Sequence, residues 1–261
     1  MRDDLLQQFV TNQNSQIEKH ARLRESEAFA AQAKRLQRLT EGFATAVHAT
    51  WLMSRRAPNI YDDFLSFRFV DDLLQSAVAI WSLAKEGQLN AAKREMRYML
   101  EASTKHAYVD IKLMGKALPD KTKYLSDVIP SSSLKFINDF RLYTFTCAEN
   151  KEFMNLILSS YGLLSRYVHR SPEQIEEALR LMSLGVAPAF ETAQQVESFV
   201  RDLSRMYDVV LVLLFNALGV GLAGDVFVNV LDCMKDWPFH KTRFVKKLSL
   251  TFDYKSERNA L

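Results

Sequence analysis

Glycine and proline are scarce in this chain, and their scarcity limits the folds open to it. Eight glycines and six prolines are spread over 261 residues, under half the combined share of an average protein. An all-β fold needs many tight turns, which these two residues largely supply. Long helices are therefore favoured, and the sequence predicts an all-α helical bundle.

Charge, cysteine content and missing motifs restrict the classes of function. The 34 basic residues exceed the 31 acidic residues by three, a bias too weak to indicate nucleic-acid binding by itself. Cys147 and Cys233 are too few for a disulfide framework or a four-cysteine metal site, and they fit a reducing compartment. The sequence contains no Walker loop, GxGxxG, HExxH or CxxC motif. We therefore expect no cofactor and no metal.

The most apolar stretch, residues 209–224, is too short and too interrupted to cross a membrane. Its sixteen residues include Asn216 and Gly219, whereas a bilayer span needs about 18–20 uninterrupted apolar residues. We expect a buried core helix here. The acidic pair Asp3–Asp4 does not fit the basic start of a signal peptide, so the sequence predicts a cytoplasmic protein without membrane contact.

Apolar residues recur every three or four positions over most of the chain, the spacing of amphipathic helices. Residues 1–57 are predicted as an N-terminal helical arm, built from one long helix or a helix pair over residues 3–56, and its first thirty residues are mostly polar. Residues 58–236 are predicted as the bundle domain. Its helices are expected at residues 61–85, 90–116, 134–145, 151–169, 171–185, 192–218 and 225–235.

Residues 237–261 are predicted as a short basic C-terminal extension. From Lys235 to the end, seven basic and three acidic residues give a net charge of +4. Apolar and polar residues alternate from Arg243 to Tyr254, which indicates a strand that pairs elsewhere or a partly ordered arm. The predicted nucleic-acid-binding residues of this extension are Lys241, Arg243, Lys246 and Lys247.

Tyr161, Ser165 and His169 recur every four residues and share one face of a predicted helix. His169 lies in the last turn, just before the helix start at Ser171–Pro172, where the negative end of the helix dipole favours an imidazolium. A histidine that titrates near neutral pH can transfer a proton to a leaving oxygen, while Arg166 holds a phosphate. The alternative is that His169 caps the helix and has no catalytic role.

A second polar face lies on the helix predicted over residues 90–116. Arg94, Arg97, Glu101 and Lys105 occupy overlapping faces of its successive turns. Arg97 and Glu101, four residues apart, form an ordinary solvent-exposed ion pair. Alternatively, if the helices pack antiparallel, they face Arg166 and His169 across a cleft.

Two segments carry a resemblance to a known family: DDLLQSAVAIWSLAKEGQLNAAKREMRYMLEAS and, after an insertion, YGLLSRYVHRSPEQ. Over about residues 61–185 the chain resembles the HEPN superfamily of helical bundles. Many members of that superfamily are metal-independent ribonucleases that act as dimers, and several are toxins or phage-defence proteins. Their usual motif is an arginine, four to six residues, and then a histidine.

The resemblance assigns the catalytic histidine to His169, with Arg166 in place of the usual arginine and Glu101 as a polar partner. This chain departs from the usual spacing, because only two residues separate Arg166 from His169. The positions where the arginine would stand hold Gly162, Leu163 and Leu164.

These observations lead to three hypotheses of function. The first is an HEPN-like RNA-targeting effector, a metal-independent ribonuclease of a bacterial defence or toxin system. Its candidate catalytic residues are His169, Arg166 and Glu101, and its candidate substrate-binding residues are Arg97, Tyr161 and Ser165. The second is a catalytically silent interaction subunit, and the third is a nucleic-acid-binding adaptor that uses the C-terminal extension. We expect a homodimer or a hetero-complex formed through the N-terminal arm.

Overall fold

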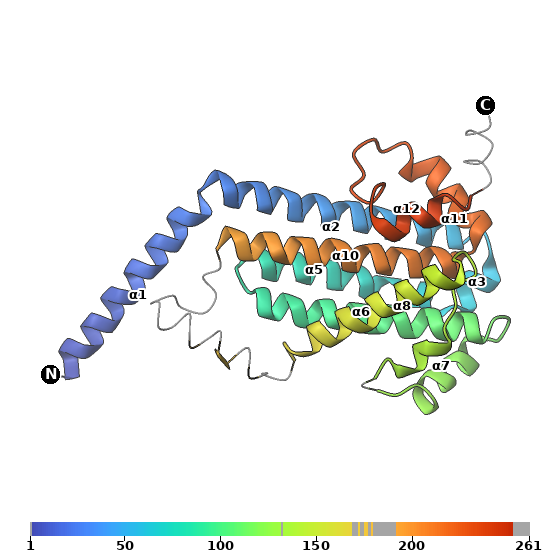
Figure 1. The fold of residues 1–261 in the computed structure, drawn as a ribbon, viewed down its shortest axis with the longest axis horizontal. Coiled ribbons are helices and arrows are strands. Elements are labelled where there is room, and N and C mark those ends of the chain that lie inside the picture. Colours follow the sequence, from blue (N-terminus) through green and yellow to red (C-terminus); the bar gives the residue numbers. More distant parts are fainter. Residues whose placement is uncertain are drawn as a thin grey trace.

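The computed structural model describes residues 2–131, 133–168 and 192–252, together with positions 172, 175, 176 and 179. Every regular element in this part of the chain is a helix, which confirms the all-α prediction (Figure 1). The elements are α1 (Arg2–Arg24), α2 (Glu27–Ser54), α3 (Pro58–Asp63), α4 (Leu65–Arg68), α5 (Val70–Lys85), α6 (Leu89–Lys112), α7 (Leu118–Asp127), the 3-10 helix η1 (Lys135–Asp139), α8 (Cys147–Ser165), α10 (Ala193–Leu218), α11 (Val220–Val226), the π-helical turn η2 (Phe227–Leu231) and α12 (Arg243–Ser249).

Four long helices form the centre of the molecule. Helix α2 packs against α10, α10 against α6, α6 against α5, and α5 against α2, so the four close into a ring around one core. The short link between α5 and α6 includes Gly87, whose φ of 75° favours glycine. Helix α8 covers the outer side of α6. Lys93 of α6 contacts Tyr167, just after α8, and Tyr108 of α6 contacts Phe140, just before α8, so these two helices run antiparallel.

Helix α10 is the most buried of the described helices. The core helix predicted over residues 209–224 is confirmed as far as Leu218, and the rest of that stretch belongs to α11 after a break at Gly219. All described residues from Met206 to Leu218 are buried, because α2, α6, α11 and α12 cover different faces of the helix. Within the described ranges, no helix is both long and apolar enough to span a membrane.

The predicted N-terminal arm consists of two helices with different surroundings. Helix α1 extends away from the bundle and meets little beyond the start of α2 (Figure 1). Helix α2 belongs to the central ring, where Leu36, Phe43 and Val47 are buried. Gly42 makes a close contact there: a Cβ at this position would lie 2.6 Å from Cδ of Pro238. The indole N–H of Trp237 donates to the Gly42 carbonyl at 2.9 Å, so Trp237 and Pro238 are fixed to the bundle.

The helix predicted over residues 61–85 is divided into α3, α4 and α5. The buried carboxylate of Asp110 accepts hydrogen bonds from the amides of Leu65 (2.8 Å) and Ser66 (2.9 Å), at the start of α4. Free N–H groups at a helix N-terminus favour an anion, so this tertiary contact starts a new helix at Leu65. Burial raises the pKa of Asp110, and the hydrogen bonds and the Lys121 ammonium, 3.3 Å away, oppose that shift.

Residues 243–249 of the C-terminal extension form helix α12, so neither the strand nor the partly ordered arm predicted there is correct for these residues. The buried residues of α12 are Phe244, Val245, Leu248 and Ser249. Asp208 of α10 accepts hydrogen bonds from the amides of Phe244 (3.0 Å) and Val245 (2.8 Å), and from Oγ1 of Thr242 (2.7 Å). A carboxylate from another helix therefore caps the first amides of α12, just as Asp110 caps the first amides of α4.

Two further helix predictions differ from the structure. Only the 3-10 turn η1 forms within residues 134–145, because the Asn150 side chain of α8 holds the chain after it. Its Oδ1 accepts from the Leu142 amide at 2.8 Å, and its Nδ2 donates to the carbonyl oxygens of Leu142 and Phe145, each at 2.9 Å. The helix predicted over residues 225–235 begins earlier, as α11, and ends in η2.

Candidate functional site

A stripe of charged residues runs along the face of α6 that meets α8. Lys93, Arg97, Glu101 and Lys105 are spaced four residues apart, which places them on one side of the helix. The side chains of Arg97, Glu101 and Lys105 are only 12–17% exposed. The Arg97–Glu101 pair is thus enclosed between helices and is not an ordinary solvent-exposed ion pair.

Arg97 is the centre of this stripe and connects α6 to the end of α8. Its Nε donates to Oγ of Ser165 at 3.0 Å, and its Nη2 donates to the Tyr161 hydroxyl at 2.7 Å. Its Nη1 lies 3.3 Å from Oε2 of Glu101. The structure therefore brings together four residues that the sequence singled out in two distant segments.

Lysines lie on both sides of this group and make its net charge positive. Lys105 Nζ donates to Oε1 of Glu101 at 2.6 Å and to the Ser131 carbonyl oxygen at 2.8 Å. Lys93 Nζ donates to the Tyr167 hydroxyl at 2.9 Å and lies 4.2 Å from the centre of its ring. Lys93 and Tyr167 are not among the sequence-predicted candidates. The four-residue interval continued one step back from Arg97 would have led to Lys93.

The hydrogen bonds of this polar cluster hold the C-terminal end of α8 against α6. An arginine has five N–H donors in a fixed planar arrangement, and Arg97 directs them to residues 101, 161 and 165. Its geometry is therefore that of a residue that positions α8. Helix α8 ends at Ser165, and a turn carries the chain on to Val168. His169 lies outside the described residues.

Arg166 does not lie with Arg97 and Glu101, in contrast to the expectation that they face one another. It is exposed and contributes to a groove of about 470 Å³ where α8, α6 and α10 meet. The other residues that line the groove are Met96, Leu156, Ser159, Ser160, Gly162, Leu163, Leu164, Asp202, Arg205 and Met206. Helix α8 therefore has the polar cluster on one face and this groove on another.

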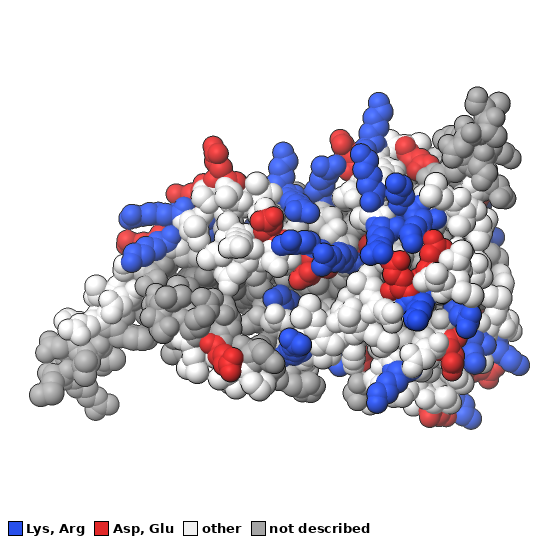
Figure 2. Space-filling model, in the orientation of Figure 1, with Lys and Arg blue, Asp and Glu red and all other residues white. Residues whose placement is uncertain are grey.

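The described basic residues of the C-terminal extension lie on or next to α12, and two of them contact the first turns of α8. Figure 2 shows lysine and arginine side chains over α12, with acidic side chains next to them. Arg243 forms an ion pair with Glu152. Lys247 Nζ lies 3.4 Å from Glu149 and 3.7 Å from Glu152. Two of the four predicted nucleic-acid-binding side chains thus have carboxylate partners, while Lys241 and Lys246 are exposed.

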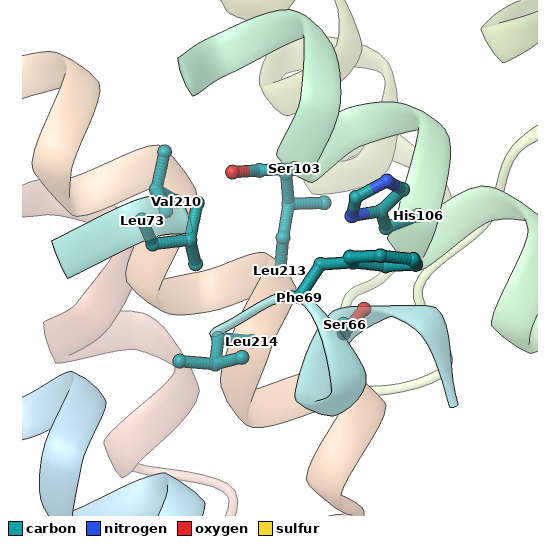
Figure 3. Close-up of a pocket in the computed structure, with 8 residues that line it drawn as sticks. All are labelled: Ser66, Phe69, Leu73, Ser103, His106, Val210, Leu213 and Leu214. Atoms are coloured by element: carbon teal, nitrogen blue, oxygen red, sulfur yellow. The ribbon is translucent and has the colours of Figure 1, made fainter. Parts of the chain in front are cut away.

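A small cavity next to His106, further along α6, does not form part of the site (Figure 3). Its volume is about 10 Å³, close to that of a single water. Phe69 lies across the imidazole, with 5.4 Å between ring centres. Burial, with a smaller contribution from the Lys105 charge, lowers the pKa of His106 to about 4. The imidazole is therefore neutral at pH 7.

The described residues offer no ready-made metal centre: no group of three His, Cys, Asp or Glu side chains among them is placed to hold an ion. Comparisons of the chain with protein-family models, with curated proteins and with solved structures give no match. Function must therefore be argued from the site itself.

Proposed function

We propose that this protein is an HEPN-like RNA-targeting effector that cleaves RNA without a metal ion. The observation that supports the proposal is the enclosed polar cluster of Arg97, Glu101, Tyr161 and Ser165 at the end of α8. Enclosing an ion pair costs desolvation, and apolar residues of the same size often stabilise a core equally well. We therefore infer that the cluster serves to fix the last turn of α8. In the sequence that turn is followed by Arg166 and His169, the candidate catalytic residues.

The reaction requires a base, an acid and a group that holds the phosphate. A base removes the proton of the 2′-hydroxyl, the resulting oxygen attacks the neighbouring phosphorus, and the bond from phosphorus to the 5′-oxygen breaks. The products are a 2′,3′-cyclic phosphate and a 5′-hydroxyl, once an acid has protonated the leaving oxygen. In the proposal His169 takes the proton of the 2′-hydroxyl and gives a proton to the leaving oxygen, and Arg166 holds the phosphate. Arg97 with Glu101 positions the last turn of α8, which His169 and Arg166 follow in the sequence.

The test is cleavage of an end-labelled RNA in the presence of EDTA. We expect products that end in a cyclic phosphate, and no cleavage of a substrate with 2′-deoxyribose at the scissile positions. His169→Ala should lower the rate by about 10²–10⁴-fold and change the free energy of unfolding by no more than about 0.5 kcal/mol. Arg166→Ala should lose activity likewise, because both residues act on one phosphate.

His48→Ala provides the matched control, because it removes an exposed histidine from α2 and should leave the cleavage rate unchanged. A purely capping role for His169 predicts instead a loss of about 1–2 kcal/mol of stability and no activity to remove. Intact RNA after incubation with the wild-type protein, in its oligomeric state and with its natural partners, would refute the proposal.

A catalytically silent interaction subunit is the second candidate, and helix α1 favours it. Val10 and Ile17, seven residues apart on one face of α1, are 53% and 52% exposed. A seven-residue repeat is the spacing through which helices pair. We propose a homodimer or a hetero-complex through this arm. The double variant Val10→Glu/Ile17→Glu should dissociate the assembly in light scattering, whereas a monomeric wild-type protein at tens of micromolar with no co-purified partner would contradict it.

A further inference from the structure

The groove beside Arg166 has an apolar floor and a cationic rim. Its floor includes Met96, Leu164 and Met206, all buried, from α6, α8 and α10. Two arginines stand at its rim, Arg166 from the end of α8 and Arg205 from α10. The groove exists because α10 packs closely on α6 but only slightly on α8. Its volume of about 470 Å³ falls in the range of sites that bind small molecules.

The charges at the rim favour an anionic ligand. Among the described residues that line the groove, the one carboxylate is that of Asp202, which lies 3.6 Å from Nη1 of Arg205, so these described residues have a net charge of +1. This pair is largely exposed, with the Arg205 side chain 63% accessible, and such pairs contribute little stability. A phosphate can therefore bind the guanidinium without breaking a strong interaction.

The floor suits a flat apolar group of the same ligand. Methionine side chains are flexible and polarizable and adapt to an aromatic surface. A nucleotide combines an aromatic base with a phosphate, the two features that the floor and the rim each complement. Enzymes that take a base out of the stack hold it between aromatic or apolar side chains, and in this groove the described side chains that could do so are apolar.

Arg205 belongs to α10, the helix against which α12 packs. It precedes Asp208 by three residues, a rise of about 4.5 Å along α10, and Asp208 is the residue that binds the start of α12. Arg243 and Lys247 of α12 are paired with Glu149 and Glu152, so the two arginines of the groove, and not α12, supply the positive charge for a ligand.

We propose that this groove binds one nucleotide of single-stranded RNA, with the base on the apolar floor and its phosphates held by Arg166 and Arg205. The inference rests on the proposed function for the nature of the ligand, and it adds a site and a binding residue, Arg205. Arg205 is a substrate-binding residue in this scheme and takes no part in proton transfer.

The experiment measures the affinity of the full-length protein for a fluorescein-labelled 2′-O-methyl hexauridylate, which cannot be cleaved, by fluorescence anisotropy. Arg205→Ala should weaken binding about tenfold, the effect of about one charge-assisted hydrogen bond. It should also lower the slope of log affinity against log salt by about 0.7. Arg205→Lys should recover part of both losses. Leu163→Glu, at an exposed lining position, should weaken binding by placing a carboxylate in the groove.

Arg201→Ala is the matched control, because Arg201 is exposed one turn away on α10 and does not line the groove. If Arg205→Ala and Leu163→Glu bind the oligonucleotide as Arg201→Ala does, the groove is not the nucleotide site, while RNA cleavage by the wild-type protein would still support the proposed function. If the wild-type protein neither binds nor cleaves RNA, both proposals are wrong.

Discussion

Similar ion pairs lie next to the two ends of helix α8, but their surroundings differ greatly in exposure. At its C-terminal end, Arg97, Glu101 and Lys105 are 12–17% exposed. At its N-terminal end, the pairs between Glu149, Glu152, Arg243 and Lys247 are 30–66% exposed. Exposed pairs contribute between about 0 and 1 kcal/mol, whereas removal of one member of an enclosed pair leaves the other charge without compensation. The contribution of these ion pairs to stability therefore depends on how deeply they are buried, and not on how many charges they contain.

The two ends also differ in how they are specified. The N-terminal end is capped locally: the Glu149 carboxylate accepts hydrogen bonds from the amide and hydroxyl of Thr146, at 3.0 and 2.9 Å, and the Thr146 hydroxyl accepts from the Glu149 amide. The C-terminal end is held by Arg97, more than sixty positions earlier in the chain. A local cap can form in an isolated helix, but the Arg97 contacts need the folded bundle.

The largest effect is expected from Arg97→Ala. The change removes the hydrogen bonds to Ser165 and Tyr161 and leaves Glu101 with Lys105 as its partner. We expect a loss of about 2–3 kcal/mol in the free energy of unfolding by urea, somewhat less than for a fully buried pair. Arg97→Lys keeps the charge but not the planar donor geometry, and it should lie between the wild type and alanine. A loss below about 0.5 kcal/mol would remove the distinction between the two ends.

An intermediate effect, dependent on pH, is expected from Glu149→Gln. Hydrogen bonds from Thr146 lower the pKa of Glu149 below that of an ordinary carboxyl group. Its ionisation therefore stabilises the fold above the unfolded-state pKa, and this contribution is lost as the pH falls through the folded-state pKa. At pH 7 the variant should be about 0.3–1 kcal/mol less stable, the usual effect of a charge at a helix N-terminus. Urea titrations from pH 7 down into the acid range should show the difference shrink as the pH falls, and a constant difference would argue against this cause.

The smallest change in stability is expected from Arg243→Ala and Lys246→Ala, singly or together. Both side chains are exposed, so each substitution should alter the free energy of unfolding by less than about 0.5 kcal/mol. If they contact phosphates, each should lower the salt dependence of RNA binding by about 0.7 in slope. An unchanged slope would assign α12 to packing alone. Substitutions are preferable to a deletion here, because Phe244 and Leu248 belong to the core.

Much of the helical framework could be predicted from local sequence patterns. The sequence predicts the long core helix α10 over residues 192–218, with its most apolar stretch from Val209 onward; in the structure a capping box of Thr192 and Gln195 begins this helix. The four-residue spacing of Arg97 and Glu101 placed them on one face of α6, and the same spacing placed Tyr161 and Ser165 together on α8. These features depend on contacts within one helix, so the sequence alone contains them.

Other features depend on contacts between distant segments and could not be predicted from local patterns. Alternating residues in the C-terminal extension fit a strand as well as a helix, until the Asp208 carboxylate supplies acceptors for the amides of Phe244 and Val245. The break before α4 likewise needs the carboxylate of Asp110. Spacing also placed Arg166 next to the cluster in sequence, but it did not show that its side chain lines a groove on another face of α8.

The sequence by itself determined that this protein is helical, where most of its long helices lie, and which polar residues share a helix face, because helix periodicity and end-capping act over a few residues. The tertiary structure decided which of those polar faces is enclosed, where the basic residues of the extension stand, and that a groove opens between α8 and α10. Those outcomes depend on how helices distant in the chain pack together. That packing determines how deeply a charge is buried. Burial in turn determines the free-energy cost of the charge and whether a ligand can reach it.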